Sequence, residues 1–198
     1  MAKLMLDSLV QLNNSTDGIT LDIRLATDNN FTGTTIYTKA AVYLHRDAAI
    51  KLETARKIAL TLGFHLHIWD AFRPLEAQQK LWDFHPDARY VSPPDNGPRT
   101  HCRGVAIDLT LASSKTGERL EMGTEFDDFR NLAHHNSTEI SEEALKNRLI
   151  LAGLMHTAGF QCHPYEWWHY ELPTLDRYPV LSDRLAGTDM MEHTADEP

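Results

Sequence analysis

Apolar and polar residues alternate along three stretches of the chain, and this period of two predicts half-buried strands. The stretches cover residues 17–27, 64–69 and 105–111. In the third stretch the apolar set would enter a core, while Asp108 would lie on the opposite face among small residues. The apolar positions are Ile19, Leu21, Ile23 and Leu25; Phe64, Leu66 and Ile68; and Val105, Ile107, Leu109 and Leu111.

Apolar residues at helical spacing predict three helices. The first opens at His45-Arg46-Asp47 and stops at Gly63, the second follows Pro74 over residues 75–82, and the third runs from Ser141 to Gly159. The expected buried stripes are Ile50, Leu52, Ala55, Ile58, Ala59 and Leu62 in the first helix, and Leu145, Leu149, Ala152 and Met155 in the third.

Two further segments lack a regular period. Residues 85–99 hold four prolines and are expected to form an irregular connection that leads to Thr100. Residues 185–198 are expected to form a loosely held polar tail.

Length and composition predict a single domain over residues 1–198. A chain of 198 residues with 42% hydrophobic content can bury one sizeable core. Nineteen basic and 28 acidic residues give a formal net charge of −9, which argues against nucleic acid or an anionic membrane as the main partner. No apolar run approaches a membrane span, and residues 1–10 lack the apolar core of a signal peptide, so we expect a cytoplasmic protein. A homodimer is compatible with this composition.

The two cysteines, Cys102 and Cys162, each neighbour a candidate site segment. A disulfide between them is conceivable, but a reducing cytoplasm favours free thiols. Cys102 directly follows His101, and adjacent side chains of an extended segment diverge, which argues against both binding one ion.

The segment from Thr100 to Asp108 has the composition of half a metal site. Fully extended, the seven residue steps from His101 to Asp108 would separate these two residues by roughly 23 Å. Both can reach one ion only if the chain folds back, and Arg103-Gly104 offers that turn.

A second segment, Glu166-Trp167-Trp168-His169-Tyr170-Glu171, offers the other half. Its aromatic run predicts a buried strand, and the bend suggested by His163-Pro164 places Glu166 just ahead of that strand. His169 would then bind the metal as the third protein ligand, which leaves the open position of a catalytic zinc site, and Glu166 would overhang it.

His65 and His67 form a rival metal motif, because two histidines on one strand face can share an ion. No carboxylate at a supporting spacing accompanies them, so we interpret them as a polar face of the sheet.

Taken together, the motifs resemble those of the zinc D-Ala-D-Ala dipeptidases, the M15-type D,D-peptidase family. The similarity rests on His101-x-x-Gly104-x-Ala106-x-Asp108 and Glu166-x-x-His169, and covers most of the chain from about residue 20 to about residue 172. Three further motifs occur in the family's order: Asn30-Phe31-Thr32-Gly33, Trp69-Asp70-Ala71-Phe72-Arg73-Pro74 and Met122-Gly123-Thr124-Glu125-Phe126-Asp127. The resemblance implies an α+β fold with an antiparallel sheet and flanking helices, similar to the zinc fold of hedgehog signalling domains.

The resemblance also implies an activity: zinc-dependent hydrolysis of D-Ala-D-Ala to free D-alanine, with one zinc ion per chain. It assigns zinc to His101, Asp108 and His169, and it makes Glu166 the general base. Arg73 matches the family arginine that stabilises the transition state, whereas its spacing alone favours an ion pair with Asp70 or Glu76.

The resemblance assigns three residues to the dipeptide substrate. Asp127 matches a position near the substrate amine, and Tyr37 matches a tyrosine that touches substrate, although packing on the core is an equal alternative. Arg99 stands where relatives carry a serine, and it is a candidate for a charge-assisted bond to the substrate carboxylate.

Two other functions stay open. One is a D,D-carboxypeptidase or cell-wall endopeptidase that acts on longer peptides, which the lack of a signal peptide disfavours. The other is a noncatalytic zinc-binding module. The presence of both Glu166 and Arg73 argues against it, because structural zinc needs neither a base nor an oxyanion partner.

Overall fold

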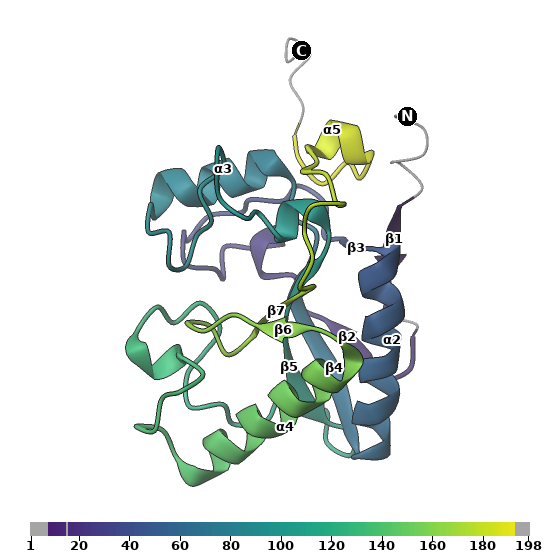
Figure 1. Ribbon diagram of the computed structural model, residues 1–198, viewed down its shortest axis with the longest axis vertical. Coiled ribbons are helices and arrows are strands. Elements are labelled where there is room, and N and C mark those ends of the chain that lie inside the picture. Colours follow the sequence, from purple (N-terminus) through teal and green to yellow (C-terminus); the bar gives the residue numbers. More distant parts are fainter. Residues whose placement is uncertain (1–7, 15, 193–198) are drawn as a thin grey trace.

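The computed structural model describes residues 8–14 and 16–192 and shows an α+β fold around a five-stranded sheet (Figure 1). The strand order is β2-β4-β5-β7-β6, with β5 at the centre between β4 and β7. The β2–β4 pair is parallel and the other three pairs are antiparallel, so the expected α+β class is confirmed with one parallel edge strand. The strands are β2 (Ile19–Leu21), β4 (Phe64–Asp70), β5 (Ala106–Ser113), β6 (Gln161–Cys162) and β7 (His169–Glu171).

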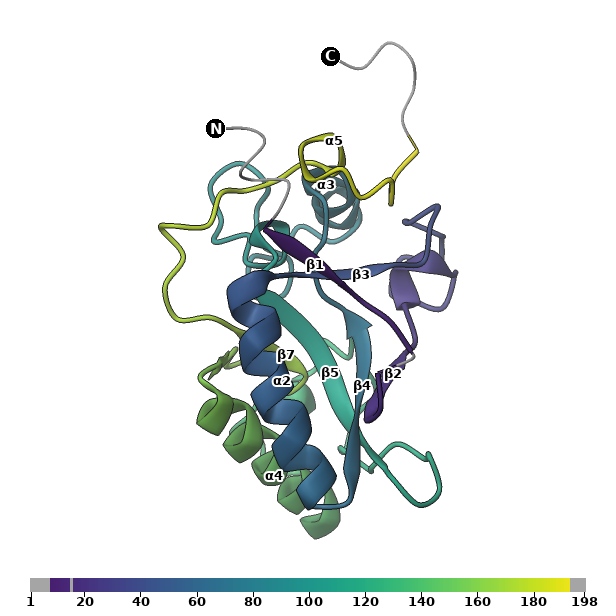
Figure 2. The same ribbon diagram turned by 90° about the vertical axis from the view of Figure 1, so that its right-hand side faces the viewer.

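Two long helices lie on one side of this sheet and pack against each other (Figure 2). They are α2 (Arg46–Thr61) and α4 (Glu142–Ala158). Ser141 caps α4 by accepting a hydrogen bond from the backbone N–H of Ala144, as its position predicted. None of the helices in the described part of the chain is long and apolar enough to cross a membrane.

The remaining elements surround the end of the sheet that carries the site. A small antiparallel pair, β1 (Leu9–Leu12) and β3 (Val42–His45), leads into α2. Helix α3 (Leu75–Phe84) follows β4, and α5 (Asp183–Ala186) lies close to it in Figure 1. The described residues also form three 3₁₀ turns: η1 (Arg24–Ala26), η2 (His101–Arg103) and η3 (Asn131–Ala133).

The predicted strand over residues 17–27 is shorter than its alternating pattern suggests. Pairing with β4 extends only from Ile19 to Leu21, and after the backbone bond from Asp22 to Ile68 the chain turns into η1. Ile23 and Leu25 are still buried, so the period correctly identified core residues but not their backbone conformation.

The predicted buried stripes of the two long helices are wrong in part. Ile50 and Leu149 are both 64% exposed. The buried positions are Ala48, Leu52, Ala55 and Ala59 in α2, and Ala144, Arg148, Leu151, Leu154, Met155 and Ala158 in α4, so Leu52, Ala55, Ala59 and Met155 were predicted correctly. Alanine carries little apolar surface, so a pattern weighted toward large side chains extended each stripe onto exposed positions and missed Ala48 and Ala144.

The C-terminal segment is not loosely held as far as residue 192. The buried Asp183 carboxylate accepts hydrogen bonds from the backbone N–H groups of Met190 and Met191 at 3.0 and 3.1 Å. Both methionines are buried, and the carbonyl of Met190 accepts a hydrogen bond from the N–H of Thr38. This anchoring corrects the expectation for residues 185–192, whereas residues 193–198 lie outside the described part of the chain.

Candidate metal centre

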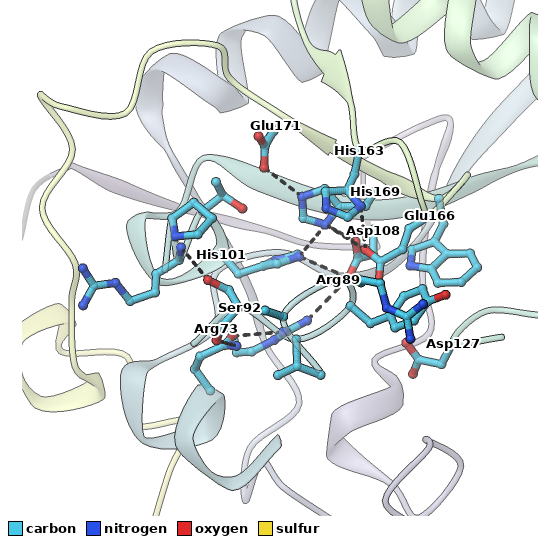
Figure 3. A pocket seen from close by; sticks show the side chains of 18 of the residues that line it. Arg73, Arg89, Ser92, His101, Asp108, Asp127, His163, Glu166, His169 and Glu171 are labelled. Atoms are coloured by element: carbon cyan, nitrogen blue, oxygen red, sulfur yellow. Dashed lines mark hydrogen bonds and ion pairs between the residues drawn. The ribbon is translucent and has the colours of Figure 1, made fainter. Parts of the chain in front are cut away.

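Three side chains predicted as metal ligands converge at one end of the sheet (Figure 3). His101 Nε2 lies 3.1 Å from His169 Nδ1 and 3.3 Å from Asp108 Oδ2, and His169 Nδ1 lies 3.1 Å from Asp108 Oδ1. All three residues are buried. Among the described residues, this is the one group of three or more histidine, cysteine or acidic side chains with the geometry of a metal site.

The backbone explains why residues far apart in sequence meet here. Asp108 and His169 are directly opposite each other in the β5–β7 pairing. His101 lies in η2, and the chain folds back through Gly104, whose φ of 66° is left-handed. A Cβ atom at Gly104 would lie 2.7 Å from Leu9 Cδ2 and 3.0 Å from the backbone N of His45, so the turn needs glycine for conformation and for space.

Both histidines are oriented by partners of their second ring nitrogen. His101 Nδ1 lies 2.6 Å from the carbonyl oxygen of Ala71, and His169 Nε2 lies 3.1 Å from Glu171 Oε2. Each partner can only accept a hydrogen bond, so each of these nitrogens carries a proton, and in the neutral imidazole the facing nitrogen is the one available to a metal. A metal-binding histidine characteristically donates its other N–H in this way.

The donor set and its spacing fit a divalent metal. Ligands about 2.0–2.1 Å from a tetrahedral zinc ion lie about 3.3–3.4 Å from one another, close to the separations observed here. Burial would lower the pKa of His169, but hydrogen bonds to Asp108 and Glu171 raise it to about 10. The surrounding carboxylates therefore favour positive charge between these side chains.

Glu166 occupies the predicted position ahead of β7. Its Oε2 atom lies 3.8 Å from His169 Nδ1 and 3.7 Å from His163 Nδ1, and the side chain lines the cavity that also exposes the three ligands. Burial raises the pKa of this carboxyl to about 8; the charge of His169 lowers it, while Asp108 and Asp127 add to the increase. A carboxyl in this range can both take up and release a proton near neutral pH.

Arg73 enters the same cavity from the end of β4. Its Nε and Nη2 atoms lie 2.9 and 2.8 Å from Asp70 Oδ2, Nη1 donates to Gln78 Oε1 at 3.1 Å, and Nη2 lies 3.6 Å from Asp108 Oδ2. Arg73 therefore pairs with Asp70, as its spacing predicted, and it lines the same cavity as the candidate metal ligands, while its role toward the transition state stays a prediction.

Asp127 lines the cavity at its far side from Arg73 and has a left-handed φ of 62°. Burial raises the pKa of its carboxyl well above the usual value, and Asp108 and Asp70 add to this effect against Arg73. The group is thus poised to ionise when a cation approaches.

The other two predicted substrate contacts are placed differently. The side chain of Tyr37 is 1% exposed and lies outside the cavity lining, with its hydroxyl donating to Asp70 Oδ1 at 2.9 Å, so the structure favours the packing alternative. Arg99 lines the cavity, but its guanidinium donates to the backbone carbonyls of Pro94, Asp95 and Gly97. A direct bond from Arg99 to substrate therefore stays a prediction.

Three residues that line the cavity had no predicted role in the site: Gln78, His163 and Glu171. Glu171 stands two positions after His169 on the same strand face, and this spacing could have identified it. Gln78 gave no such signal, because it reaches Arg73 only through the packing of α3.

The rival features did not assemble into a site. His67 Nε2 lies 3.4 Å from Asp22 Oδ2, and His65 joins no group of metal ligands among the described residues. Cys102 is buried and Cys162 is exposed, and both thiols are free, as expected.

Comparison with known proteins identifies close relatives. A family model described as D-ala-D-ala dipeptidase, Peptidase M15, matches residues 5–185. The D-alanyl-D-alanine dipeptidase of Escherichia coli (strain K12) is 39% identical over 166 residues, with 84% of this chain and 85% of the relative covered. The D-alanyl-D-alanine dipeptidase of Enterococcus faecium is 33% identical over 180 residues, with 81% and 89% covered.

A crystal structure of the vancomycin resistance D,D-pentapeptidase VanY in complex with Zn(II) is similar at 13% identity and a TM-score of 0.42, over 68% of this chain and 75% of that one. This similarity is too low to support an inference about the present chain. The match of the family model and the identity with the dipeptidases establish the family. The chain belongs to the M15 peptidase family of D-Ala-D-Ala dipeptidases, and it is a metallopeptidase.

Proposed function

We propose that this protein hydrolyses the dipeptide D-Ala-D-Ala to free D-alanine with one zinc ion per chain. The observation that carries the proposal is that Glu166 and Arg73 line the same cavity as His101, Asp108 and His169. A noncatalytic zinc site would need neither of the first two. The substrate is proposed from the names of the relatives, both D-alanyl-D-alanine dipeptidases, and their sequence identity to this chain supports the same substrate here.

His101, Asp108 and His169 would hold the zinc ion. Two imidazole nitrogens and one carboxylate form a three-ligand set of the catalytic type, which keeps one position open. Zinc bound to such a set supplies Lewis-acid chemistry and lowers the pKa of water to about 7.

Glu166 acts as the proton carrier. Its carboxylate takes the proton of the attacking water and delivers it to the nitrogen of the leaving D-alanine. The raised pKa favours both steps: it makes the carboxylate a stronger base toward water, and it lies close enough to neutral pH for the carboxyl to release the proton again.

Arg73 stabilises the negative charge that develops on the carbonyl oxygen of the scissile peptide bond. Burial alone would lower its pKa, but Asp70, Tyr37 and Asp108 raise it overall, so the guanidinium is always charged. Hydrogen-bond donors that are already oriented toward such an oxyanion typically contribute about 10²- to 10³-fold to kcat.

Asp127 would recognise the free amine of the dipeptide. An ammonium group beside it would favour ionisation of this carboxyl, so that each charge compensates the other. Arg99 lines the same cavity, and its charge favours the carboxylate end of the substrate there.

The experiment that tests the function compares three substrates: D-Ala-D-Ala, N-acetyl-D-Ala-D-Ala and a pentapeptide ending in D-Ala-D-Ala. We expect release of D-alanine from the dipeptide, abolished by a chelator and restored by zinc, and rates at least about a hundredfold lower on the other two, because buried polar groups would lack partners. Comparable rates on all three would favour the D,D-carboxypeptidase alternative. Zinc binding without hydrolysis of any substrate would favour the noncatalytic module.

A further inference from the structure

A buried chain of hydrogen bonds leads from the core of the protein to the guanidinium of Arg73. Tyr37, on the segment between η1 and β3, donates its hydroxyl to Asp70 Oδ1 at 2.9 Å. The other carboxylate oxygen, Asp70 Oδ2, lies 2.9 Å from Nε and 2.8 Å from Nη2 of Arg73. Each oxygen of Asp70 is thus used by a different donor.

This chain determines how the guanidinium is oriented. Asp70 is 2% exposed, so its carboxylate is stable only when both oxygens have donors. Burial raises the pKa of Tyr37 well above its usual value, and Asp70 adds to the increase, which keeps the hydroxyl protonated as a donor. Removing that hydroxyl would leave Oδ1 without this donor and free the carboxylate to rotate.

Gln78 holds the opposite side of the same guanidinium. Its Oε1 atom accepts from Arg73 Nη1 at 3.1 Å, and its Nε2 atom donates to the carbonyl of Ser92 at 2.7 Å. Asp70 and Gln78 together fix all three nitrogens of the guanidinium. The nitrogen nearest to the metal ligands, Nη2, is one that Asp70 orients, at 3.6 Å from Asp108 Oδ2.

We infer that Tyr37 and Asp70 are positioning residues, which act on the reaction only through Arg73. This inference rests on the proposed function, since it concerns the group that faces the developing oxyanion. Tyr37 itself lies outside the cavity lining, so a direct contact with substrate does not explain an effect on the reaction. Preorganisation of Arg73 does, because a donor that must reorient during the reaction loses much of its stabilising effect.

The first test is Tyr37→Phe, with Tyr178→Phe as a matched control. Tyr178 is also buried and donates its hydroxyl to a carboxylate, Asp47 Oδ2, at 2.8 Å, but it does not line the site. We expect Tyr37→Phe to lower kcat about 10- to 100-fold, the scale of a small displacement of a catalytic group. KM and bound zinc should stay at wild-type values, and Tyr178→Phe should leave all three unchanged.

The second test asks whether the effect passes through Arg73. In the Arg73→Ala background, Tyr37→Phe should cause no further loss of kcat, because the group it positions is gone. Asp70→Asn, which keeps the shape of the side chain, is measured with and without Arg73→Ala in the same way. It tests the same positioning role even if Tyr37→Phe does not fold well.

Several outcomes would overturn the inference. These are an undiminished kcat in Tyr37→Phe, an equal loss in Tyr178→Phe, or losses that multiply independently in the Arg73→Ala background. A rise in KM alone would instead restore Tyr37 as a substrate contact and also refute the positioning role. A wild-type protein that binds zinc but does not cleave D-Ala-D-Ala would refute the proposed function itself, and the two failures are thereby distinguished.

Discussion

Replacing Glu171 by alanine should weaken metal binding without removing a metal ligand. Glu171 Oε2 accepts the hydrogen bond from His169 Nε2 at 3.1 Å, and Gln161 donates to its other oxygen at 3.0 Å. Burial would raise the pKa of Glu171, but the hydrogen bond and charge of His169 lower it to about 2, so it is ionised at neutral pH. Without this acceptor, the imidazole of His169 loses its fixed tautomer and orientation.

The magnitude follows from the kind of contact. Loss of a partner that orients a metal-binding histidine typically lowers metal affinity about 10- to 100-fold. This range corresponds to about 1.4–2.8 kcal/mol of binding free energy, at about 1.4 kcal/mol for each factor of ten. Glu171→Gln keeps an oxygen that can accept from His169 Nε2 and loses only the charge, so its loss should fall near the lower limit.

The assay is competition for zinc between each variant and a chromophoric chelator, followed by kcat at saturating zinc. Glu125→Ala serves as control, because this glutamate is largely exposed and, within the described part of the chain, its ion pair is with Arg119 at 3.3 Å on the surface. We expect weaker zinc binding in both Glu171 variants with kcat largely retained once zinc is bound. Wild-type zinc affinity in Glu171→Ala would refute the orienting role of this carboxylate.

Four further predictions follow from the site. His101→Ala should lose stoichiometric zinc and activity together, as metal analysis of the purified variant would show, whereas retention of both would place the site elsewhere. Glu166→Gln should keep zinc but lose about 10²- to 10⁴-fold in kcat; near-normal turnover with zinc bound would exclude Glu166 as the base. In the metal-free protein, the buried Glu166 carboxyl retains its proton up to about pH 8, whereas an unfolded chain releases it near pH 4.5. Between these two pH values the folded state binds more protons than the unfolded state, so the free energy of unfolding should fall as pH rises. Denaturant titrations at several pH values should show a shallower decline for Glu166→Gln than for the wild type. Thiol titration should detect Cys162 in the native protein and Cys102 only after unfolding, because burial raises the pKa of Cys102 to about 12.

The convergence of His101, Asp108 and His169 could be predicted because their positions depend on local signals. A histidine, a glycine turn and an alternating strand bring His101 back toward Asp108, and the structure adds only the pairing of β5 with β7. The position of Glu166 in a bend also follows from the neighbouring residues. In these cases the conformation of a few consecutive residues decides where a side chain points.

Other features depended on contacts between distant segments and could not be read from spacing. The hydroxyl of Tyr37 meets Asp70 across 33 positions of sequence. The guanidinium of Arg99 donates to backbone carbonyls of its own proline-rich connection. These hydrogen bonds compete with the substrate contact that its charge suggested. The Asp183 carboxylate holds the segment up to Met191 by accepting hydrogen bonds from backbone N–H groups. Nearly all residue types carry such groups, so the amino-acid sequence does not indicate which of them a carboxylate will bind.

An irregularity in β4 explains why Asp70 serves the site rather than the core. Leu66 pairs with Leu111 and Ile68 with Leu109, and a regular ladder would place Asp70 opposite Ile107, among buried apolar side chains. The register shifts between Ile68 and Asp70, so that Asp70 instead pairs with Asp108. A bulge of this kind moves one side chain to the other face of a sheet and bends the strand. It brings the carboxylate that holds Arg73 beside the strand position of Asp108, so one extra residue in β4 places Arg73 next to the candidate metal ligands.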